Sequence, residues 1–287
     1  MMPDDLVRSL RGEKLYGDDF SRGELQAWFD DEREAYANLG AKQRADYRYG
    51  YHALNVEHGF RHLPDRRFER VLSFGGAYGD ELLPVISRVK HVVISDPSDA
   101  LAVSEIRGVP VQYTKPQVDG TIPFPDGAFD LLTCLGVLHH IPNVSAVVAE
   151  FSRCLAPGGY ALVREPVISM GDWRVPRRGL TMRERGIPIA ILRSTLRSAG
   201  FSIARETMCM FPLTYRFHWF LKDPVFNYRA IVKWDRLVSG MFMWNFRYHA
   251  NNLWQKFRPA SAFYVLQKPL PAPTTQSRPD RRALTVP

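Results

Sequence analysis

Residues 70–80 read RVLSFGGAYGD and decide the fold. A mostly apolar run leads into three glycines, Gly75, Gly76 and Gly79. Glycine lets the backbone approach a ligand closely, and a helix that begins near Asp80 would offer free N–H groups in its first turn. The stretch predicts a buried strand, a ligand-binding turn and a helix, although a tight turn without a ligand has the same pattern.

The glycine spacing disfavours a nicotinamide dinucleotide as the ligand. Read from Gly75, the turn is GGAYGD, with Ala77 and Asp80 where the dinucleotide pattern GxGxxG has its later glycines. A pyrophosphate packed beside Asp80 would meet a like charge.

Further strand candidates follow at intervals that suit βαβ crossovers. Those between residues 70 and 164 are apolar on both faces, as strands of a buried parallel sheet are, whereas residues 262–267 alternate. The expected strands are residues 70–74, 91–95, 109–113, 129–134, 160–164, 201–208 and 262–267. Helices are expected from Ser21 through Tyr36, from about Lys42 to His62, and from about Pro188 to Ala199.

The composition is that of an ordinary globular chain. Its 287 residues suit one large α/β domain with insertions or two small domains, and 45% are hydrophobic. The three cysteines form no CxxC pair, so a reducing compartment is expected. There is no apolar signal region at the N-terminus and no window near the ~18–20 apolar residues of a membrane span. We expect a cytoplasmic protein.

An acidic residue ends the second expected strand. Residues 92–97 read VVISDP, and Asp96 follows Gly79 by 17 residues. A carboxylate at this place can accept hydrogen bonds from both hydroxyls of a ribose. An Asp-Pro pair is also common in plain turns, but the glycine turn upstream favours the ribose.

Two longer motifs complete the order: IPFPDGAFDLLTCLGVLHHIPN at residues 122–143 and LAPGGYALVRE at 155–165. With VLSFGGAYGDEL and VVISDPS, they resemble class I methyltransferases that use S-adenosylmethionine (SAM), especially the branch related to the ubiquinone/menaquinone-biosynthesis C-methyltransferases. The resemblance implies a Rossmann-like α/β fold. Its seven-stranded sheet is mostly parallel, with an antiparallel last strand.

The same resemblance assigns SAM contacts by position. They are Gly75, Gly76, Ala77 and Gly79 around the methionine part, Asp96 at the ribose, Asp119 and Gly120 at the adenine edge, and Leu135 and Gly136 beside the sulfonium. The chain departs from the family at Ser73, where an acid is frequent, and at Ala77, where glycine is frequent.

Methyl transfer from a sulfonium is an in-line displacement, so the protein supplies alignment, exclusion of water and a base for a weakly acidic acceptor. His140 and His139 follow the fourth strand at the edge where ligands bind in such folds, and Glu165 ends the fifth. Each has a structural alternative, since a histidine can cap or pack and Glu165 can pair with Arg164. No metal is expected, because no Asp/Asp/Asn cluster is present.

Residues 209–261 are unusually aromatic and basic, with fourteen aromatics, eight Lys or Arg and two acids. This insert between the last two strands is expected to cover the substrate, since aromatic faces suit sugar rings and arginines suit phosphates. Two alternatives are a helical subdomain whose aromatics form its own core and peripheral contact with an anionic membrane.

The N-terminal stretches 14–40 and 47–60 resemble the leading helices of bacterial methyltransferases associated with polysaccharide and glycan biosynthesis. That resemblance points to a saccharide hydroxyl as acceptor, in a pocket lined by Tyr51, His52, Asn55 and His58.

The expected organisation has five parts. These are an N-terminal helical cap (1–67), the SAM-binding core (68–208), the insert (209–261), the last strand (262–268) and a disordered tail (269–287).

The expected function is SAM-dependent O-methylation of a sugar or glycan hydroxyl. The alternatives are another small-molecule or lipid acceptor and a non-catalytic scaffold subunit. The formal charge of +8 would suit nucleic acid, but the basic residues cluster in the insert and the motifs of nucleic-acid methylation are missing. The expected location is cytoplasmic, with peripheral contact at the inner membrane face as the alternative.

Overall fold

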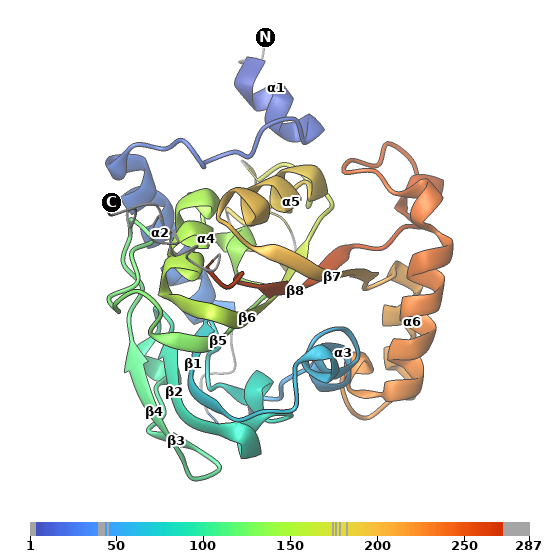
Figure 1. Cartoon of the computed structure of the whole chain (residues 1–287). Coiled ribbons are helices and arrows are strands. Elements are labelled where there is room, and N and C mark those ends of the chain that lie inside the picture. Colours follow the sequence, from blue (N-terminus) through green and yellow to red (C-terminus); the bar gives the residue numbers. More distant parts are fainter. Residues whose placement is uncertain are drawn as a thin grey trace, which may run out of the picture.

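The computed structural model describes residues 4–39, 44, 46–173, 175, 177, 179–181 and 183–271, with the backbone alone for residues 33–39. Within them lies one eight-stranded sheet in the order β3-β4-β2-β1-β5-β6-β8-β7 (Figure 1). The strands are β1 Phe68–Phe74, β2 Val89–Ser95, β3 Glu105–Ile106, β4 Val109–Thr114, β5 Phe129–Leu135, β6 Leu155–Pro166, β7 Ser202–Cys209 and β8 Ser261–Gln267.

The sheet confirms the α/β class and the mostly parallel arrangement. Strands β4, β2, β1, β5 and β6 are parallel neighbours, and β8 runs antiparallel between β6 and β7. All seven expected strands are present. The eighth, β3, is a two-residue strand that pairs antiparallel with β4 and was not expected.

The strand order reverses at β1, whose neighbours are β2 on one side and β5 on the other. In open α/β sheets a crevice forms at such a switch point, outside the carboxyl ends of the strands. The ends of β1, β2 and β5 carry the glycine turn, Asp96 and Gly136, so the topology brings these separate motifs to one place.

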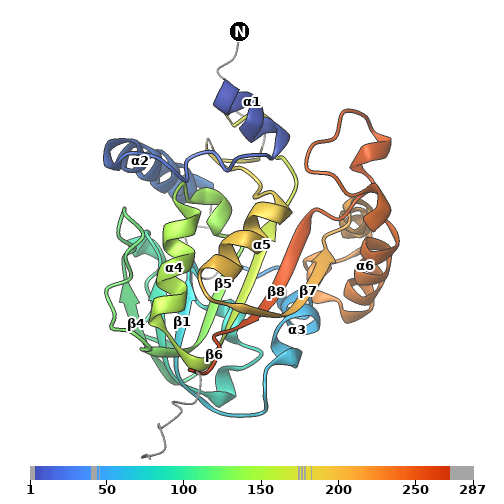
Figure 2. The ribbon, with the colours of Figure 1, turned by 45° about the horizontal axis from the view of Figure 1, so that its top comes forward.

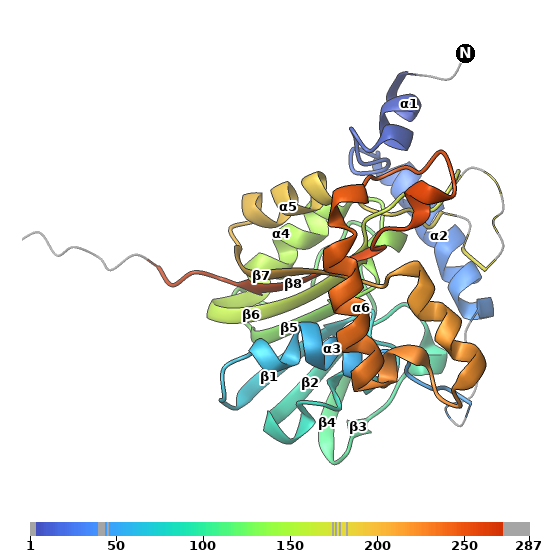
Figure 3. The ribbon, with the colours of Figure 1, turned by 90° about the vertical axis from the view of Figure 1, so that its right-hand side faces the viewer.

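Helices cover both faces of the sheet. The described residues form the α-helices α1 Asp4–Arg11, α2 Arg22–Leu39, α3 His52–His58, α4 Val144–Cys154, α5 Ile189–Ser198 and α6 Arg229–Met241. Helices α4 and α5 lie on one face of the sheet, and α3 and the insert helix α6 lie on the other, while α2 lies beyond one end of the strands (Figures 2 and 3). Each face has its own buried apolar cluster, with Leu72 and Phe151 in one and Val71 and Leu54 in the other.

The helix expected over residues 42–62 is wrong in its extent. Helix α3 spans only His52–His58, followed by a 3-10 turn at Phe60–His62; residues 40–43 and 45 lie outside the described part. Asn227 of the insert explains the late start. Its side chain donates to the carbonyl of Tyr49 (2.8 Å) and accepts the N–H of His52 (2.7 Å), so it holds this segment outside a helix.

The helix expected at Asp80 is also wrong. Two 3-10 turns, Asp80–Leu82 and Ile86–Arg88, follow the glycine turn. Pro84 lies between them, and a proline at this position has no N–H to continue a helix and clashes with the preceding turn. His139 and His140 lie in a further 3-10 turn, Leu138–His140, ahead of α4, which starts at Val144.

The insert folds mainly as α6 with short 3-10 turns on either side. The buried Asp235 of α6 accepts the N–H groups of Met210 and Phe211 (2.8 Å each) and the hydroxyl of Thr214, so α6 is fixed to the end of β7. Within the described residues, no helix combines the length and apolar character that crossing a membrane needs. Residues 272–287 of the expected tail lie outside the described part.

Candidate active site

Two cavities meet at the carboxyl ends of β1 and β5. Phe74, Gly75 and Gly136 line both of them. The first cavity extends toward Asp96 and the loop 116–120 and is covered by α2. The second cavity, of about 470 Å³, extends toward the segment 47–51, the loop 166–170 and the insert. An elongated ligand could therefore occupy the first cavity and present one end to the second.

The glycine turn is shaped by close approaches that side chains would block. Gly75 has a φ of +68°, and a Cβ there would lie 2.5 Å from Val137. Ala77 also has a positive φ, of 50°, and its N–H donates to Asp96 (3.1 Å). The sequence predictions placed Gly76 and Ala77 at the ligand, and both line the second cavity. Gly79 lines neither cavity; it packs against Ile106.

Asp96 lies in the first cavity, where a ribose acid is expected. It is 1% exposed, and its two oxygens accept the N–H groups of Ala77 and Ser98 at 3.1 Å. Burial raises the pKa of Asp96, while these two hydrogen bonds lower it in part. The carboxylate is thus fixed in position on the wall of the cavity.

Of the two residues predicted at the adenine edge, one lines the first cavity and the other does not. Gly120 lines the first cavity, with Gln117 and Val118 beside it. Asp119 is exposed and lines neither cavity. Its carboxylate accepts the N–H of Thr121 (2.9 Å), which makes it a turn residue.

Helix α2 forms the outer wall of the first cavity, a role that was not predicted for it. Leu25, Trp28, Phe29 and Glu32 line it. The Trp28 indole N–H donates to the carbonyl of His140 (2.7 Å), which ties α2 to the turn after β5. The spacing of these residues places them on one face of the helix, but it does not predict which part of the protein that face contacts.

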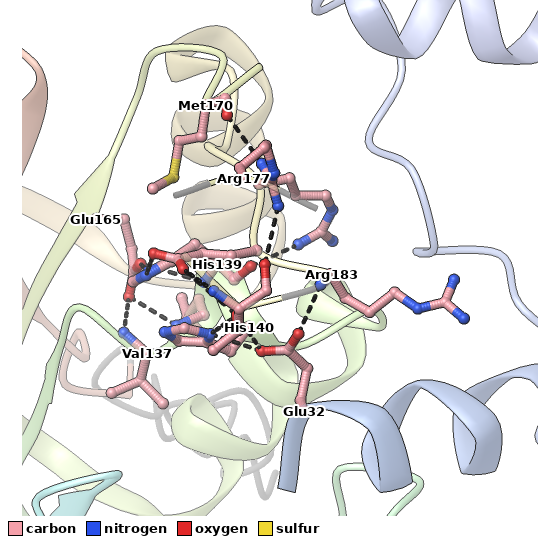
Figure 4. Close-up of polar contacts among 12 residues, drawn as sticks. Glu32, Val137, His139, His140, Glu165, Met170, Arg177 and Arg183 are labelled. Atoms are coloured by element: carbon pink, nitrogen blue, oxygen red, sulfur yellow. Dashed lines mark hydrogen bonds and ion pairs between the residues drawn. The ribbon is translucent and has the colours of Figure 1, made fainter. Parts of the chain in front are cut away.

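Glu165 is an anchor for the turn after β5 (Figure 4). It is fully buried and accepts the N–H groups of Val137 (2.9 Å), Leu138 (2.8 Å) and His139 (3.2 Å). It lines neither cavity and does not pair with Arg164. A carboxylate that receives so many donors fixes backbone geometry and is poorly placed to take a proton from a ligand.

His139 lies in the second cavity between two carboxylates. Its Nδ1 is 2.8 Å from Glu165 and its Nε2 is 3.3 Å from Glu184. Burial by itself lowers the pKa of His139, but the hydrogen bonds to Glu165 and Glu184 outweigh it and raise the pKa to about 9. Despite burial, the contacts with His139 lower the pKa of Glu184 to about 2. At neutral pH His139 is therefore an imidazolium beside two carboxylates.

His140 belongs to the first cavity. Its Nδ1 lies 2.8 Å from Glu32 of α2, which also accepts the hydroxyl of Thr181 (2.7 Å) and the N–H of Arg183 (2.7 Å) (Figure 4). Burial and the charge of His139, whose ring centre is 4.1 Å away, lower the pKa of His140. The two adjacent histidines thus have different charges and face different cavities.

In the described part of the chain, one group of side chains could hold a metal ion. Ligand atoms of His139, His140 and Glu184 all lie within 4.8 Å of one another. A metal would require His139 to lose its proton. The proton on His139 accounts for the same short contacts, so the expectation of no metal stays a prediction.

Of the four residues predicted to line the acceptor pocket, Tyr51 lines the second cavity. Asn55 lies behind the wall, where it bonds to Tyr49 (2.6 Å) and Arg164 (3.2 Å). His52 does not line the cavity, and His58 lies in the core against Thr207 (2.8 Å), where burial lowers its pKa to about 3.

Several residues of the second cavity were not expected. Arg164 is 5% exposed, lies 4.1 Å above the ring of Tyr51 and donates to the carbonyl of Leu135 (3.1 Å). Leu135, which was predicted to lie beside the sulfonium, lines this cavity. Glu184 comes from the loop before α5, and Met210 and Tyr215 come from the insert. Long-range packing brings these residues together, and no local pattern marks them.

Comparison with known proteins agrees with this geometry. A family model described as a methyltransferase domain matches residues 47–212, more than half of the chain. Ubiquinone biosynthesis O-methyltransferase of Burkholderia thailandensis is 27% identical over 111 residues, which cover 37% of this chain and 47% of that protein. The Burkholderia pseudomallei enzyme is 27% identical over 103 residues, which cover 34% and 44%. The chain spans about half the length of the curated relatives it matches.

Solved structures support the fold. The cyclase SpnF has a TM-score of 0.54 at 17% identity, covering 90% of this chain and 100% of that chain. A SAM-dependent methyltransferase from Leishmania major has a TM-score of 0.54 at 12% identity, covering 84% and 83%. At such identities the likeness concerns the fold alone, and the family model is what identifies the chain. The sequence belongs to the methyltransferase-domain family, within the class I superfamily that uses SAM.

Proposed function

We propose that this chain transfers a methyl group from SAM to a hydroxyl of an acceptor in the second cavity, and that the acceptor is a sugar or glycan. The observation that carries the proposal is the meeting of the two cavities at Gly75 and Gly136, with Asp96 in one and the His139–Glu184 pair in the other. A ribose on Asp96 would direct the reactive end of the cofactor toward that junction.

When bound, SAM supplies an activated methyl group on a sulfonium. The chain's own residues then align the acceptor and receive its proton. The methyl group would pass to the acceptor oxygen, the C–S bond would break and S-adenosylhomocysteine (SAH) would be the leaving group. Nε2 of His139, in its neutral form, would take the proton of the acceptor hydroxyl. Glu165 and Glu184, on either side of the ring, stabilise the imidazolium that forms. Glu165 thus acts as a positioning residue for the base.

A saccharide acceptor is supported by the lining of the second cavity. Tyr47, Tyr49, Tyr51 and Tyr215 offer aromatic faces, and Arg164 offers a charged donor beside them. The curated relatives are named ubiquinone biosynthesis O-methyltransferases, which favours oxygen as the accepting atom and keeps a different small-molecule or lipid acceptor as the alternative.

The proposal is tested by calorimetry with SAH and by a methyl-donor assay over a panel of sugars, glycans and quinol-type phenols. We expect SAH to bind, Asp96→Ala to weaken it at least tenfold through loss of the ribose contacts, and a saccharide to be methylated. Binding of SAH without methylation of any saccharide would reject the acceptor class. No binding of SAH to a monodisperse sample would leave only the scaffold alternative.

We also propose peripheral contact of the insert with an anionic membrane. Large apolar side chains of the insert are strongly exposed, among them Trp219 (65%), Phe220 (82%), Trp244 (78%) and Trp254 (81%). Such residues mixed with arginine and lysine are typical of interfacial binding. Co-sedimentation with phosphatidylglycerol vesicles should fall when Trp219 and Phe220 are both changed to Ser, and phosphatidylcholine vesicles serve as the control. Equal sedimentation of the variant and the parent would reject this contact.

A further inference from the structure

A carboxyl group lies beneath the glycine turn and takes no part in the function described above. Glu81, in the 3-10 turn after β1, is 3% exposed and lines the second cavity beside Gly76 and Ala77. Its Oε1 accepts the hydroxyl of Ser73. Its Oε2 is buried and has no hydrogen-bond partner among the residues that the structure describes.

A second buried oxygen without a partner among the described residues belongs to a residue of the same cavity lining. Thr133 also lines the second cavity, and its Oγ1 makes no hydrogen bond within the described residues. Ser73 and Thr133 are register partners on the adjacent parallel strands β1 and β5, so their side chains share one face of the sheet. A buried oxygen without a hydrogen-bond donor lowers the stability of the fold. Two such oxygens in the lining of one cavity indicate a ligand that supplies donors.

The backbone is shaped to leave room for this carboxyl group. A Cβ on Gly76 would overlap the Ser73 hydroxyl and lie 2.5 Å from Glu81 Oε1, so no larger residue fits there while Glu81 keeps its place. Two other carboxyl groups, those of Asp80 and Asp96, act on the charge of Glu81. Burial, followed by Asp80 and Asp96, raises the pKa of Glu81 to about 7, and Asp80 itself is paired with Arg44 (2.6 Å). A cation would be favoured here.

We propose that Glu81 Oε2, together with Thr133 Oγ1, binds the α-ammonium group of the methionine part of SAM. This inference rests on the proposed function, because it takes SAM to be the donor. The geometry supports it, since Glu81 lines the second cavity next to Gly75, the residue at which the cavities join. An ammonium group has three donors and no acceptor, which suits a carboxylate and a hydroxyl that are both short of donors.

The test compares three probes by calorimetry on the full chain: SAH, its desamino analogue, which keeps the carboxylate, and 5′-methylthioadenosine, which lacks the whole amino-acid part. The variant Glu81→Gln keeps the shape and removes the charge. We expect it to weaken SAH at least tenfold and to leave both other probes within about twofold, since a charge-assisted hydrogen bond is lost only with SAH. Glu69→Gln, at the exposed start of β1, is the matched control and should change none of them.

A second variant tests the same site independently, in case Glu81→Gln does not fold. Thr133→Val keeps the volume, removes one acceptor, and should weaken SAH about threefold without affecting 5′-methylthioadenosine. The inference is overturned if Glu81→Gln weakens all three probes alike, weakens none, or lowers kcat while the affinity for SAH is unchanged. If the parent chain binds neither SAH nor SAM, both this inference and the proposed function are rejected. If the parent binds SAH and Glu81→Gln binds it equally well, only this inference fails.

Discussion

His58, which was predicted to line the acceptor pocket, lies in the core of the protein. It is fully buried, bonds to Thr207 and stacks on Phe263 at a ring distance of 6.1 Å. Burial lowers its pKa to about 3, so the folded state holds it neutral while the unfolded chain protonates near pH 6.5. A lowered pKa stabilises the fold above pH 6.5, and this contribution is lost as the pH falls toward 3.

The free energy of unfolding should therefore drop by about 3 kcal/mol from this residue alone between pH 7 and pH 4. Urea unfolding at both pH values measures it. His58→Leu should show a smaller pH-dependent drop than the parent, whereas His91→Gln, at an exposed position, should show the same drop. An equal drop in His58→Leu would mean that His58 is already charged in the folded protein.

Glu184 sets the pH at which His139 can accept a proton. Hydrogen bonds to Glu165 and Glu184 raise the pKa of His139 to about 9, so its neutral form grows as the pH rises toward 9. We expect kcat to rise over the same range. Glu184→Gln removes one of the two carboxylates, lowers the pKa of His139 and should move the rise to lower pH. Profiles of kcat against pH measure this, and a rise that stays in place would reject His139 as the base.

The group of His139, His140 and Glu184 also defines a test by metal removal. If the proton on His139 balances the two carboxylates, dialysis against EDTA should leave the affinity for SAH and the methylation rate unchanged. Elemental analysis before and after dialysis checks that any ion has been removed. Activity that is lost on dialysis and restored by Mg²⁺ or Zn²⁺ would contradict the prediction of no metal and assign these three residues as ligands.

Individual residues differ in how well the sequence predicts their place in the structure. The place of Asp96 in the first cavity follows from the sheet topology, because a residue at the end of a strand beside the switch point is fixed by the sheet, and its role at a ribose stays a prediction. Ser73 was recognised as a departure from a frequent acid, but Glu81 was not recognised as the carboxyl group beside it, because their contact depends on the turn between them. Arg164 and Glu184 face one cavity only through long-range packing.

At the scale of elements, strands were easier to predict than helices. Buried parallel strands carry apolar residues on both faces, a strong local signal, and all seven expected strands exist. The helix expected at Asp80 does not form, because Pro84 has no N–H to continue it. The helix expected from Lys42 failed because Asn227, far along the chain, holds the backbone of Tyr49 and His52. Tertiary contacts of this kind override local propensity.

Helix α2 offers a test of its role as the wall of the first cavity. Phe29 lines that cavity and is partly exposed, so its truncation should cost little stability. Phe29→Ala should weaken SAH about fivefold, through loss of apolar contact, with a nearly unchanged Tm. Gln26→Ala, at an exposed position of the same helix, is the control. Unchanged affinity in Phe29→Ala, measured by calorimetry, would show that α2 does not contact the cofactor.

At the scale of the whole molecule, segments far apart in the chain close over one crevice. Helix α2 covers the first cavity, and the segment 47–51 and the insert enclose the second. Asn227 binds the insert to the segment 47–52, and Asp235 binds it to the end of β7. Hydrogen bonds therefore connect the two segments that enclose the second cavity. Apart from α2, the first cavity is lined by segments that directly follow the strands, while the second cavity is assembled from the segment 47–51, the loop 166–170 and the insert.

This arrangement predicts where a bound cofactor will reduce motion. At a concentration 100-fold above its Kd, SAH should add about 2.7 kcal/mol to the free energy of unfolding, seen as a rise in Tm. Hydrogen exchange should slow most at the glycine turn and α2, because both line the first cavity. The α6 residues Leu237 and Met241 are more than half exposed and line neither cavity, so amides around them should be unaffected by SAH. Protection spread evenly over α2 and α6 would contradict a cofactor confined to the junction of the two cavities.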